Sequence, residues 1–471
     1  MTKKRRLGLS PHNWLDAFFD ADSFLSINSR SDGDDVKHFG DEVIAGVGTV
    51  GGVPVAAYAH DPKVDRGFIS VQGAEKICRL MDKALAHQTP IVCFLASPGI
   101  SISEGILSGD AYTKVIARTI SMSGAIPQIA VVIGVTMGAP AYSATLMDFI
   151  LFNKVRSHLM VTSPNVVKDV LGEDTTLAEL GGSEMHATKT GLVDFVDKNI
   201  EQQIERAKAL IRLFPSKACD HARKIASRPP RHLLPKLPIY DNYAFEMSEV
   251  IGGLVDGSEF LRYKEGFGKS MICAFAYIDG NPVGILANNC KHLSGAIDTD
   301  AASKSARFIR LCDAYGVPIL TLIDVPGFMP GSVEEQKGLL RHGAQFCSAM
   351  QTSVARISVV IRRCYGAAAY LMMQTASQEG DLVVAVKKSK IGIMGFEAAR
   401  NVLFSDDERS EDELREFYFN HYESPTLALE RGVIDKIIEY EDIRNVLTQH
   451  LIWSRRKQPV DMIKKKHSII P

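Results

Sequence analysis

The chain has 471 residues, of which 46% are hydrophobic and 23% are charged, and its formal net charge is -1. This composition is typical of a folded globular protein of about two to four domains, and it excludes a fibrous or wholly disordered chain. The balanced charge gives no global attraction to nucleic acid, and no apolar run approaches the roughly 18 residues of a membrane span. Because no apolar segment follows the basic residues Lys3 to Arg6, we expect no secretory signal and a cytoplasmic protein.

In chain order, the first half begins with two β-rich runs around Gly51-Gly52, which is the pattern of a hairpin. An amphipathic helical pattern, a short apolar strand, a second helical pattern and a second apolar strand follow. The second half repeats this order, with Asp279-Gly280 in the hairpin turn. The strands are expected at residues 43–50, 53–58, 91–95 and 129–133 and again at 271–278, 282–287, 319–323 and 357–361, and the first-half helices at 73–86 and about 111–123.

The two halves are copies of one pattern. A shift of 228 positions aligns them without an insertion from residue 43 to residue 142, so we interpret the chain as two copies of one domain. We expect these domains at residues 1–225 and 226–471, joined through an irregular stretch rich in proline. The aligned identities include Gly52/Gly280, Pro54/Pro282, Lys76/Lys304, Arg79/Arg307, Gly99/Gly327, Gly138/Gly366, Ala139/Ala367 and Tyr142/Tyr370.

The most informative positions are two junctions between a strand and a helix. Strands that alternate with helices indicate parallel sheets, in which ligands bind beyond the carboxyl ends of the strands. In each copy the second buried strand runs into two small residues, Gly138-Ala139 or Gly366-Ala367, and then into a helical stretch. The amides at such a helix start suit an oxyanion, for example an enolate, a thioester oxygen or a phosphate. The alternative explanation is close packing of a helix on a strand.

Other side chains are weaker candidates. The chain lacks a GxSxG motif, a Walker A loop and a GxGxxG helix start, and its eight cysteines include no CxxC pair, so we expect buried free cysteines and no metal site. Arg362-Arg363 is either an anion-binding pair or an exposed pair, and the basic tail 455–467 is either solvated or meets an acidic partner. Surface, capping or other structural roles are favoured over catalytic ones for Glu104, Asp148, Glu397, His158, His186, His292 and His342.

Five stretches are more specific than any single glycine motif. They are residues 179–183 (ELGGS) with His186-Ala187, 301–310 (AASKSARFIR), 320–331 (LTLIDVPGFMPG), 341–344 (RHGA) and 430–435 (ERGVID). Together they resemble the carboxyltransferase (β) subunit of biotin-dependent acyl-CoA carboxylases, of the propionyl-CoA and acetyl-CoA type. The resemblance extends over nearly the whole chain, from about residue 15 to residue 447.

The resemblance implies an α/β fold of two tandem crotonase-like (ClpP/crotonase) β-β-α superhelix domains, in agreement with the repeat. By similarity, the first domain faces acyl-CoA, and the Gly138 and Ala139 amides hold the thioester oxygen as an enolate forms. The second domain faces biotin, and the Gly366 and Ala367 amides hold the carbonyl of carboxybiotin. In the family, biotin that has lost carbon dioxide takes the α-proton. Further contacts to these two substrates are expected from Gly67, Phe68, Tyr142, Tyr365 and Tyr370.

The first half departs from the family pattern. Relatives usually carry Asp-Ser-Gly-Gly-Ala-Arg-Ile where this chain has ASPGISI at residues 96–102, and a Gly-Gly-Ser step near Arg66-Gly67-Phe68. The second glycine of each oxyanion pair is alanine, and Tyr370 stands near a position that tunes acyl length in relatives. Carboxyl transfer with biotin is therefore better supported than any particular acyl acceptor.

The resemblance also implies partners. Because the chain shows no biotin-attachment motif and no ATP-grasp half, we expect it to work with a separate biotin carboxylase and biotin carboxyl carrier protein. We expect a hexamer, since in relatives each site lies between two chains. The main alternative is a biotin-dependent acyl-CoA decarboxylase subunit, because one site serves both directions. A hydratase or isomerase of the crotonase group is disfavoured by the duplication, and a non-catalytic assembly partner of a carboxylase is the last alternative.

Overall fold

The computed structural model describes residues 10–27, 40–214, 225–238, 243–374, 380–405 and 407–454. The chain divides into two compact units, Met1–Arg223 and Lys224–Pro471, and each is described by itself. Cys219 and the basic tail 455–467 lie outside the described residues. Within the described ranges, none of the helices combines the length and the apolar character that a bilayer span requires.

The first unit is built on a sheet that starts from a hairpin. Strands β2 (Val43–Val50) and β3 (Val53–His60) pair antiparallel, and the turn between them holds Gly51 and Gly52 at φ angles of +58° and +76°. Glycine is favoured at both angles, which explains why the turn forms at these two residues. The predicted hairpin is confirmed. The strands that follow β3 pair in parallel, and the described strands of the sheet lie in the order β1-β2-β3-β4-β5-β7-β9.

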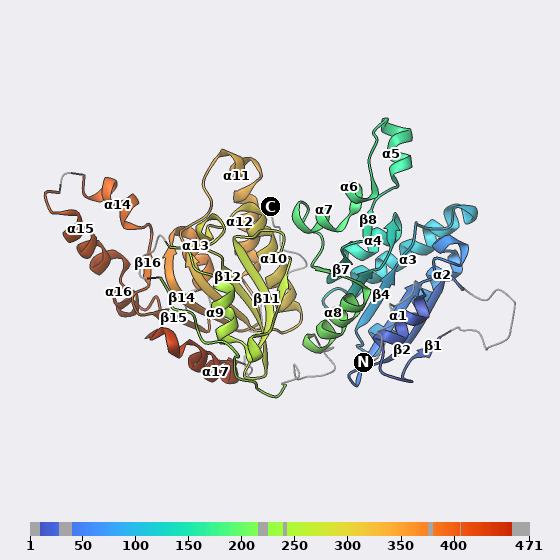
Figure 1. Cartoon of the computed structure of the whole chain (residues 1–471), viewed down its shortest axis with the longest axis horizontal. Helices are drawn as coiled ribbons and strands as arrows, with labels where there is room; N and C mark the ends of the chain where they lie inside the picture. The colour runs from blue at the N-terminus through green and yellow to red at the C-terminus, as the bar shows by residue number, and fades with distance from the viewer. Residues whose placement is uncertain are drawn as a thin grey trace, which may run out of the picture. The chain divides into compact units, whose positions relative to one another are not determined.

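Figure 1 labels most of the other elements of this unit. Its further strands are β1 (Leu25–Ser26), β4 (Ile91–Leu95), β5 (Gln128–Val132), β6 (Val135–Met137), β7 (Phe149–Asn153), β8 (His158–Met160) and β9 (Phe195–Asp197). Its helices are α1 (Pro11–Phe18), α2 (Val71–Ala86), α3 (Ile106–Met122), α4 (Ala139–Thr145), α5 (Pro164–Leu171), α6 (Leu177–Gly181), α7 (Ser183–Thr188) and α8 (Ile200–Leu213), with 3-10 turns at Asp65–Gly67 and Ile102–Glu104.

Helix α2 shows why this sequence packs on the sheet. Its N-cap residue, Ser70, accepts a hydrogen bond from the Gly73 amide at 3.0 Å, which satisfies one of the free donors of the first turn. Apolar residues at helical spacing, among them Ile77, Leu80 and Met81, are buried in the core of the first unit. Helix α3 lies against α2 (Figure 1), so the helical patterns predicted from the sequence form one packed layer.

The second unit repeats this architecture. Strands β11 (Met271–Ile278) and β12 (Asn281–Asn288) form the antiparallel hairpin, and the described strands follow the order β10-β11-β12-β13-β14-β15-β17, with β16 paired to β14. Its further strands are β10 (Phe260–Tyr263), β13 (Ile319–Val325), β14 (Arg356–Tyr365), β15 (Leu382–Val386), β16 (Lys390–Gly392) and β17 (Lys436–Ile438). Its helices are α9 (Met247–Leu254), α10 (Thr299–Ala314), α11 (Ser332–Gln336), α12 (Leu339–Ala349), α13 (Gly366–Met373), α14 (Phe396–Leu403), α15 (Glu411–Tyr418), α16 (Pro425–Glu430) and α17 (Ile443–Ser454), with 3-10 turns at Asp256–Ser258, Leu293–Gly295 and Tyr440–Asp442 and a π-helix at Phe419–Glu423.

The predicted duplication is visible in the backbone itself. Residues with a positive φ angle recur at the 228-residue offset, even where the side chains differ. Because few residues other than glycine adopt such angles, their repetition shows that both copies fold through the same turns. The matching pairs are Arg66 (+56°) with Ser294 (+53°), Gly67 (+81°) with Gly295 (+83°), Gly99 (+139°) with Gly327 (+144°), and Gly138 (+64°) with Gly366 (+67°).

Candidate active site

In the first unit, strand β6 runs directly into helix α4 at Gly138. This residue caps the helix at a φ angle of +64°, and its N–H is shared between the carbonyl oxygens of Met160 and Val161 at 3.3 and 3.2 Å. Helix α4 then begins at Ala139, whose amide has no acceptor within the helix. The next residue, Pro140, has no N–H at all. The Ala139 amide is therefore the donor that this helix start presents.

Ser97 connects the turn at Gly67 to this junction. Its hydroxyl donates to the Gly67 carbonyl oxygen at 2.6 Å, and its own carbonyl accepts from the Met137 amide at 2.9 Å. A Cβ atom on Gly67 would lie 3.0 Å from the Ala96 carbonyl oxygen, so the close approach of these two segments requires glycine. Gly67 and the junction at Gly138, which are far apart in sequence, thus meet around one serine. Phe68 follows the turn and is half-buried.

The second unit builds the corresponding junction at the end of β14. Gly366 opens helix α13 at a φ angle of +67°, and the exposed residue Ala367 follows it in the first turn. Strand β16 pairs with the end of β14, as β8 pairs with β6 in the first unit. A Cβ atom on Gly366 would lie 3.5 Å from the Ile393 carbonyl oxygen, with no nearer atom outside its chain neighbours and its own helix backbone. The open space around Gly366 leaves room for a ligand atom.

The three tyrosines predicted to contact substrates lie in two different settings. Tyr142 in α4 is 53% exposed and Tyr370 in α13 is 42% exposed, at matching positions about one turn beyond each glycine. Tyr365 instead points into the second unit, where its hydroxyl donates to the Glu423 carboxylate at 2.8 Å. Tyr142 and Tyr370 can therefore contact a molecule at the surface, whereas the Tyr365 hydroxyl is occupied within the fold.

Arg362 and Arg363 form an internal ion-pair network. Arg362 contacts Asp324 at 2.7 Å and Arg363 contacts it at 2.8 Å, and the Asp324 side chain is fully buried. Burial alone raises the pKa of Asp324, but the hydrogen bonds and charges of the two guanidinium groups outweigh it and bring the pKa below its usual range. Arg363 also donates to the Ser294 carbonyl at 2.9 Å, which anchors the turn before Gly295. The pair is thus neither an exposed pair nor a ready anion site.

The candidate acids have structural partners. Glu104 accepts a hydrogen bond from the first amide of α2, that of Val71, at 2.8 Å, and Asp148 accepts from the Gln128 amide at the start of β5, also at 2.8 Å. Glu397 forms an ion pair with Arg415 on the surface at 2.7 Å. The second copy repeats the first two contacts, through Glu334 to Thr299 and Asp381 to Arg356.

The histidines named above also have structural surroundings. His186 bonds to the Leu159 carbonyl and to Thr190, and His158 bonds to the Arg156 carbonyl. His292 is exposed, and His342 lies beside Arg341. Within the described ranges, no group of three or more His, Cys, Asp or Glu side chains is placed to hold a metal ion.

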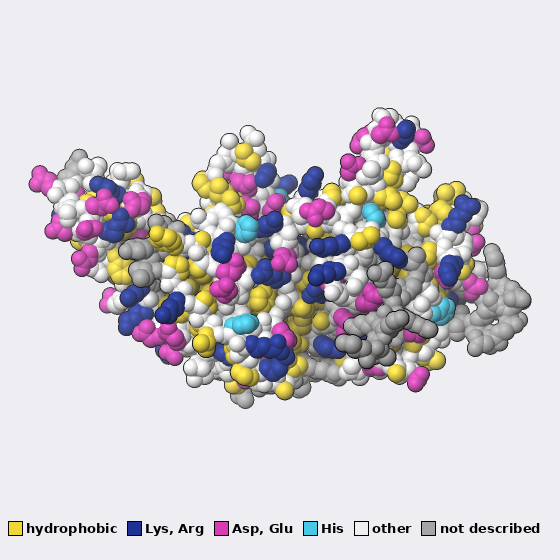
Figure 2. Space-filling model, viewed as in Figure 1, with side chains coloured by type: hydrophobic (Ala, Val, Ile, Leu, Met, Phe, Trp, Pro, Cys, Tyr) yellow, Lys and Arg dark blue, Asp and Glu magenta, His cyan; other side chains and the backbone are white. Residues whose placement is uncertain are grey.

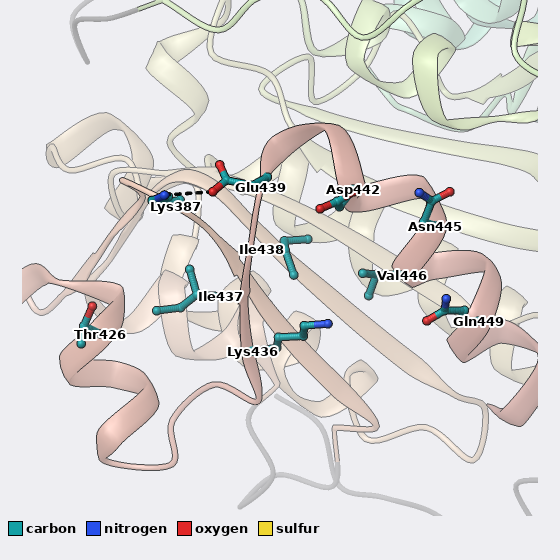
Figure 3. A pocket seen from close by; sticks show the side chains of 10 residues that line it. All are labelled: Lys387, Thr426, Lys436, Ile437, Ile438, Glu439, Asp442, Asn445, Val446 and Gln449. Carbon is teal, nitrogen blue, oxygen red and sulfur yellow. Dashed lines mark hydrogen bonds and ion pairs between the residues drawn. The ribbon is translucent and has the colours of Figure 1, made fainter.

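Two cavities of the second unit lie beside its sheet. One, of about 900 Å³, lies beside the middle of β14 and the carboxyl end of β15, between Ile361, Val386 and the segment 230–238. The other, of about 650 Å³, lies between β17 and α17, and Figure 3 shows Lys387 at its rim, paired with Glu439 at 3.0 Å. Gly366 and Ala367 line neither cavity. The second junction is therefore an open surface of this unit rather than the wall of either cavity.

Comparisons with known proteins agree with this geometry. The family profile described as "Carboxyl transferase domain" matches residues 12–470. The chain belongs to the carboxyl transferase family. It is 34% identical to the propionyl-CoA carboxylase carboxyltransferase subunit of Haloferax mediterranei, over 96% of this chain and 90% of that one. It is also 34% identical to the methylmalonyl-CoA decarboxylase subunit alpha of Veillonella parvula, over 97% of this chain and 90% of that one.

A solved structure shows the same fold. The transcarboxylase 12S crystal structure, described as a hexamer with methylmalonyl-coenzyme A bound, superposes with a TM-score of 0.89 at 32% identity. The match covers 98% of this chain and 92% of that one. The expected crotonase-like α/β fold and the predicted family are thereby confirmed.

Sequence reasoning missed several residues that shape the two junctions. No sequence motif marks Ser97, His60 or Glu423 as functional, and Asp324 stands out only within the motif at residues 320–331. His60 is fully buried, accepts from the Ala96 amide at 3.4 Å and lies in a dry environment that lowers its pKa to about 3. Its counterpart Asn288 accepts from the Asp324 amide at 3.3 Å. The repeat alignment pairs His60 with Asn288, and this signal could have indicated a shared structural role.

Proposed function

We propose that this chain is the carboxyltransferase component of a biotin-dependent acyl-CoA carboxylase. The observation that carries the proposal is the presence of two junctions of one geometry, each placing small residues and helix-start amides at a strand end, in a chain of the carboxyl transferase family. A transfer between two carbonyl compounds needs two such sites. One stabilises the oxygen of the acceptor enolate, and the other holds the carbonyl of carboxybiotin.

The two units divide these tasks in our proposal. The first unit binds acyl-CoA, with the thioester oxygen at the Gly138-Ala139 junction and Gly67 and Phe68 beside it. The second unit binds carboxybiotin at Gly366-Ala367. Tyr142 and Tyr370, which are exposed about one turn beyond each junction, contact the respective substrates.

The chemistry assigned to the chain is positioning and electrostatic stabilisation. The bond between the carboxyl carbon and the biotin nitrogen breaks, the α-proton of the acyl-CoA moves to biotin, and the carboxyl carbon bonds to the α-carbon. The acidic candidates have other partners, since Glu104 and Asp148 accept from backbone amides in the first unit and Glu397 pairs with Arg415 in the second. Amide donors at fixed helix starts stabilise the developing charge without reorganisation.

Reconstitution tests this function. The purified chain is mixed with biotin carboxylase, biotinylated carrier protein, ATP and ¹⁴C-bicarbonate, and acid-stable label is counted with acetyl-, propionyl- and longer acyl-CoA. We expect label to enter at least one acyl-CoA, and only when the carrier is biotinylated. Absence of label with every acyl-CoA, from preparations in which the carrier is demonstrably carboxylated, would contradict the proposal.

A decarboxylase subunit is the second candidate. The observation that favours it is the 34% identity to the methylmalonyl-CoA decarboxylase subunit of Veillonella parvula. The same mixture, supplied with methylmalonyl-CoA and biotinylated carrier but without ATP, measures the reverse direction. Faster reverse than forward turnover at matched concentrations would assign the chain to decarboxylation.

We further propose that the chain assembles as a hexamer in the cytoplasm. Both units expose apolar side chains at corresponding positions beyond their junctions, and Figure 2 shows apolar surface near α5 in the first unit and near β16 in the second. Such surface is typical of subunit contacts. The seven described cysteines are all free, as is usual in a reducing compartment. Beyond Tyr142 the offset between the two copies grows from 228 to 232 residues, and at this offset the corresponding exposed residues are Val161 with Ile393, Val170 with Val402, and Leu171 with Leu403.

A further inference from the structure

A buried polar pair lies directly behind the second junction. Tyr365, the last residue of β14, is 8% exposed, and its hydroxyl donates to the Glu423 carboxylate at 2.8 Å. Glu423 is 2% exposed and lies 58 residues further along the chain. The next residue after Tyr365 is Gly366, so this hydrogen bond fixes the side chain of the residue from which α13 starts.

The local backbone around Glu423 brings this residue close to β16. Helix α15 continues into a π-helix at Phe419–Glu423, a wide turn that is rare and is often found at functional sites. This turn approaches β16 so closely that a Cβ atom on Gly392 would lie 3.2 Å from the Tyr422 carbonyl oxygen and 3.7 Å from a Glu423 side-chain carbon. Gly392 is also the residue that pairs with Tyr365 between β16 and β14. The π-helix, β16 and the end of β14 therefore meet at one place.

The first unit lacks this support. The residue before Gly138 is Met137, which pairs with Met160 between β6 and β8. Two methionines therefore occupy the positions that Tyr365 and Gly392 occupy in the second unit. The backbone at Gly138 nevertheless has the same positive φ angle as Gly366. The Tyr365–Glu423 bond is thus unnecessary for the turn itself. It is an addition to the second junction.

We propose that Glu423 is a positioning residue for the carboxyl-donor half of the reaction. Its carboxylate holds the Tyr365 hydroxyl, and through Tyr365 it sets the direction in which β14 presents the Gly366 and Ala367 amides to carboxybiotin. The inference rests on the proposed function for its kinetic consequence. Its structural consequence, a rigid start of α13, is measurable without turnover.

Four variants of the full chain test this inference. Y365F and E423A remove the hydrogen bond, E423Q keeps an oxygen acceptor for the Tyr365 hydroxyl, and Y418F is the matched control. Tyr418 is the last residue of α15, directly before the π-helix, and its hydroxyl donates to the Met394 carbonyl at 2.7 Å, so Y418F deletes a tyrosine hydrogen bond that involves neither Tyr365 nor Glu423. Steady-state carboxyl transfer is measured in each variant, with kcat and the KM for acyl-CoA determined separately. Hydrogen exchange is followed in the peptide covering residues 366–373.

We expect Y365F and E423A to lower kcat by about tenfold or more with an unchanged KM for acyl-CoA, because small displacements of positioned groups are costly. E423Q should stay within about fivefold of wild type, since a neutral acceptor weakens the bond without removing it. Exchange in 366–373 should accelerate in Y365F and E423A only. Equal behaviour of Y365F and Y418F in both measurements would overturn the inference. If the wild type transfers no carboxyl group but exchange still separates the variants, the proposed function fails and the positioning contact stands.

Discussion

Single residues decide how each junction is built. Gly138 and Gly366 have φ angles of +64° and +67°, which residues with a Cβ atom adopt only under strain. At Gly366 there is space beside the backbone, so a side chain there would meet a ligand rather than the protein. Gly432 makes it possible to separate the effect of backbone strain from the effect of blocking the site. It has nearly the same φ angle, +68°, and no atom lies within 4 Å of an added Cβ atom.

We predict that Gly366→Val lowers carboxyl transfer by about a hundredfold or more, whereas Gly432→Val leaves it near wild type. Both variants carry similar backbone strain, so their melting temperatures should fall by similar amounts. Transfer rates and thermal unfolding of both proteins check this prediction. A wild-type rate in Gly366→Val would remove Gly366 from the site.

A second prediction at this scale concerns His60. Burial lowers its pKa from 6.5 to about 3, so the histidine stays uncharged in the fold while the unfolded chain takes up a proton below about pH 6.5. The free energy of unfolding should therefore fall as the pH drops from 6.5 towards 3, by about 2–3 kcal/mol near pH 4.5.

His60→Asn should remove this part of the acid sensitivity, because asparagine does not titrate and the second copy already uses Asn288 in the same role. The measurement is urea unfolding at pH 7 and 4.5, followed by the fluorescence of Trp14, which is buried in the first unit, in a Trp453→Phe background. An equal loss of stability in wild type and His60→Asn would refute the assignment.

The contact between the ends of two neighbouring segments of the sheet has different chemistry in the two units. In the second unit, Asp324 at the end of β13 binds Arg362 and Arg363 on β14. At the matching positions of the first unit, Ala96 and Gly134 approach so closely that a Cβ atom on Gly134 would lie 3.0 Å from that of Ala96. Charge joins the strands in one copy, and small size allows close packing in the other.

We predict that Asp324→Ala destabilises the second unit by about 3–5 kcal/mol, because it leaves two guanidinium groups without their buried partner. Asp82→Ala is the control, since the Asp82–Arg118 pair is on the surface and should contribute about 1 kcal/mol or less. Calorimetry of both variants at neutral pH measures the difference. Because the folded pKa of Asp324 is lowered, its contribution should be complete above pH 4 and disappear on acidification through the folded pKa. Equal melting temperatures for the two variants would contradict the prediction.

For the complete protein, the exposed apolar residues of the two units support the proposed hexamer. Val170 and Val402 occupy corresponding helices and are 73% and 71% exposed in the single chain. We predict that light scattering gives a mass near six times the 51.6 kDa of one chain. Val170→Asp and Val402→Asp should shift the protein towards smaller species and reduce carboxyl transfer in parallel. A monomer with full activity would contradict both the assembly and the shared site.

Much of the architecture of this protein follows from local sequence patterns. The strands at 43–50, 91–95 and 271–278 agree with the prediction to the residue, and the 228-residue repeat predicts two copies of one domain and the matching glycines, while the family resemblance implies their crotonase-like fold. These features depend on local alternation, apolar runs and turn residues, which a linear pattern records directly. The family, too, follows from motifs that are contiguous in the chain.

The pairing of distant side chains, in contrast, becomes visible only in the folded chain. In the sequence Glu423 is one of several glutamates in a helical pattern. No sequence feature predicts its hydrogen bond to Tyr365, which lies 58 residues away. The sequence around Arg362-Arg363 is compatible with an exposed pair and with an anion site. In the folded chain both guanidinium groups bind Asp324. The physical reason is that the environment of a polar side chain depends on which distant segments exclude water from it. That exclusion exists only once the sheet has brought the strand ends together.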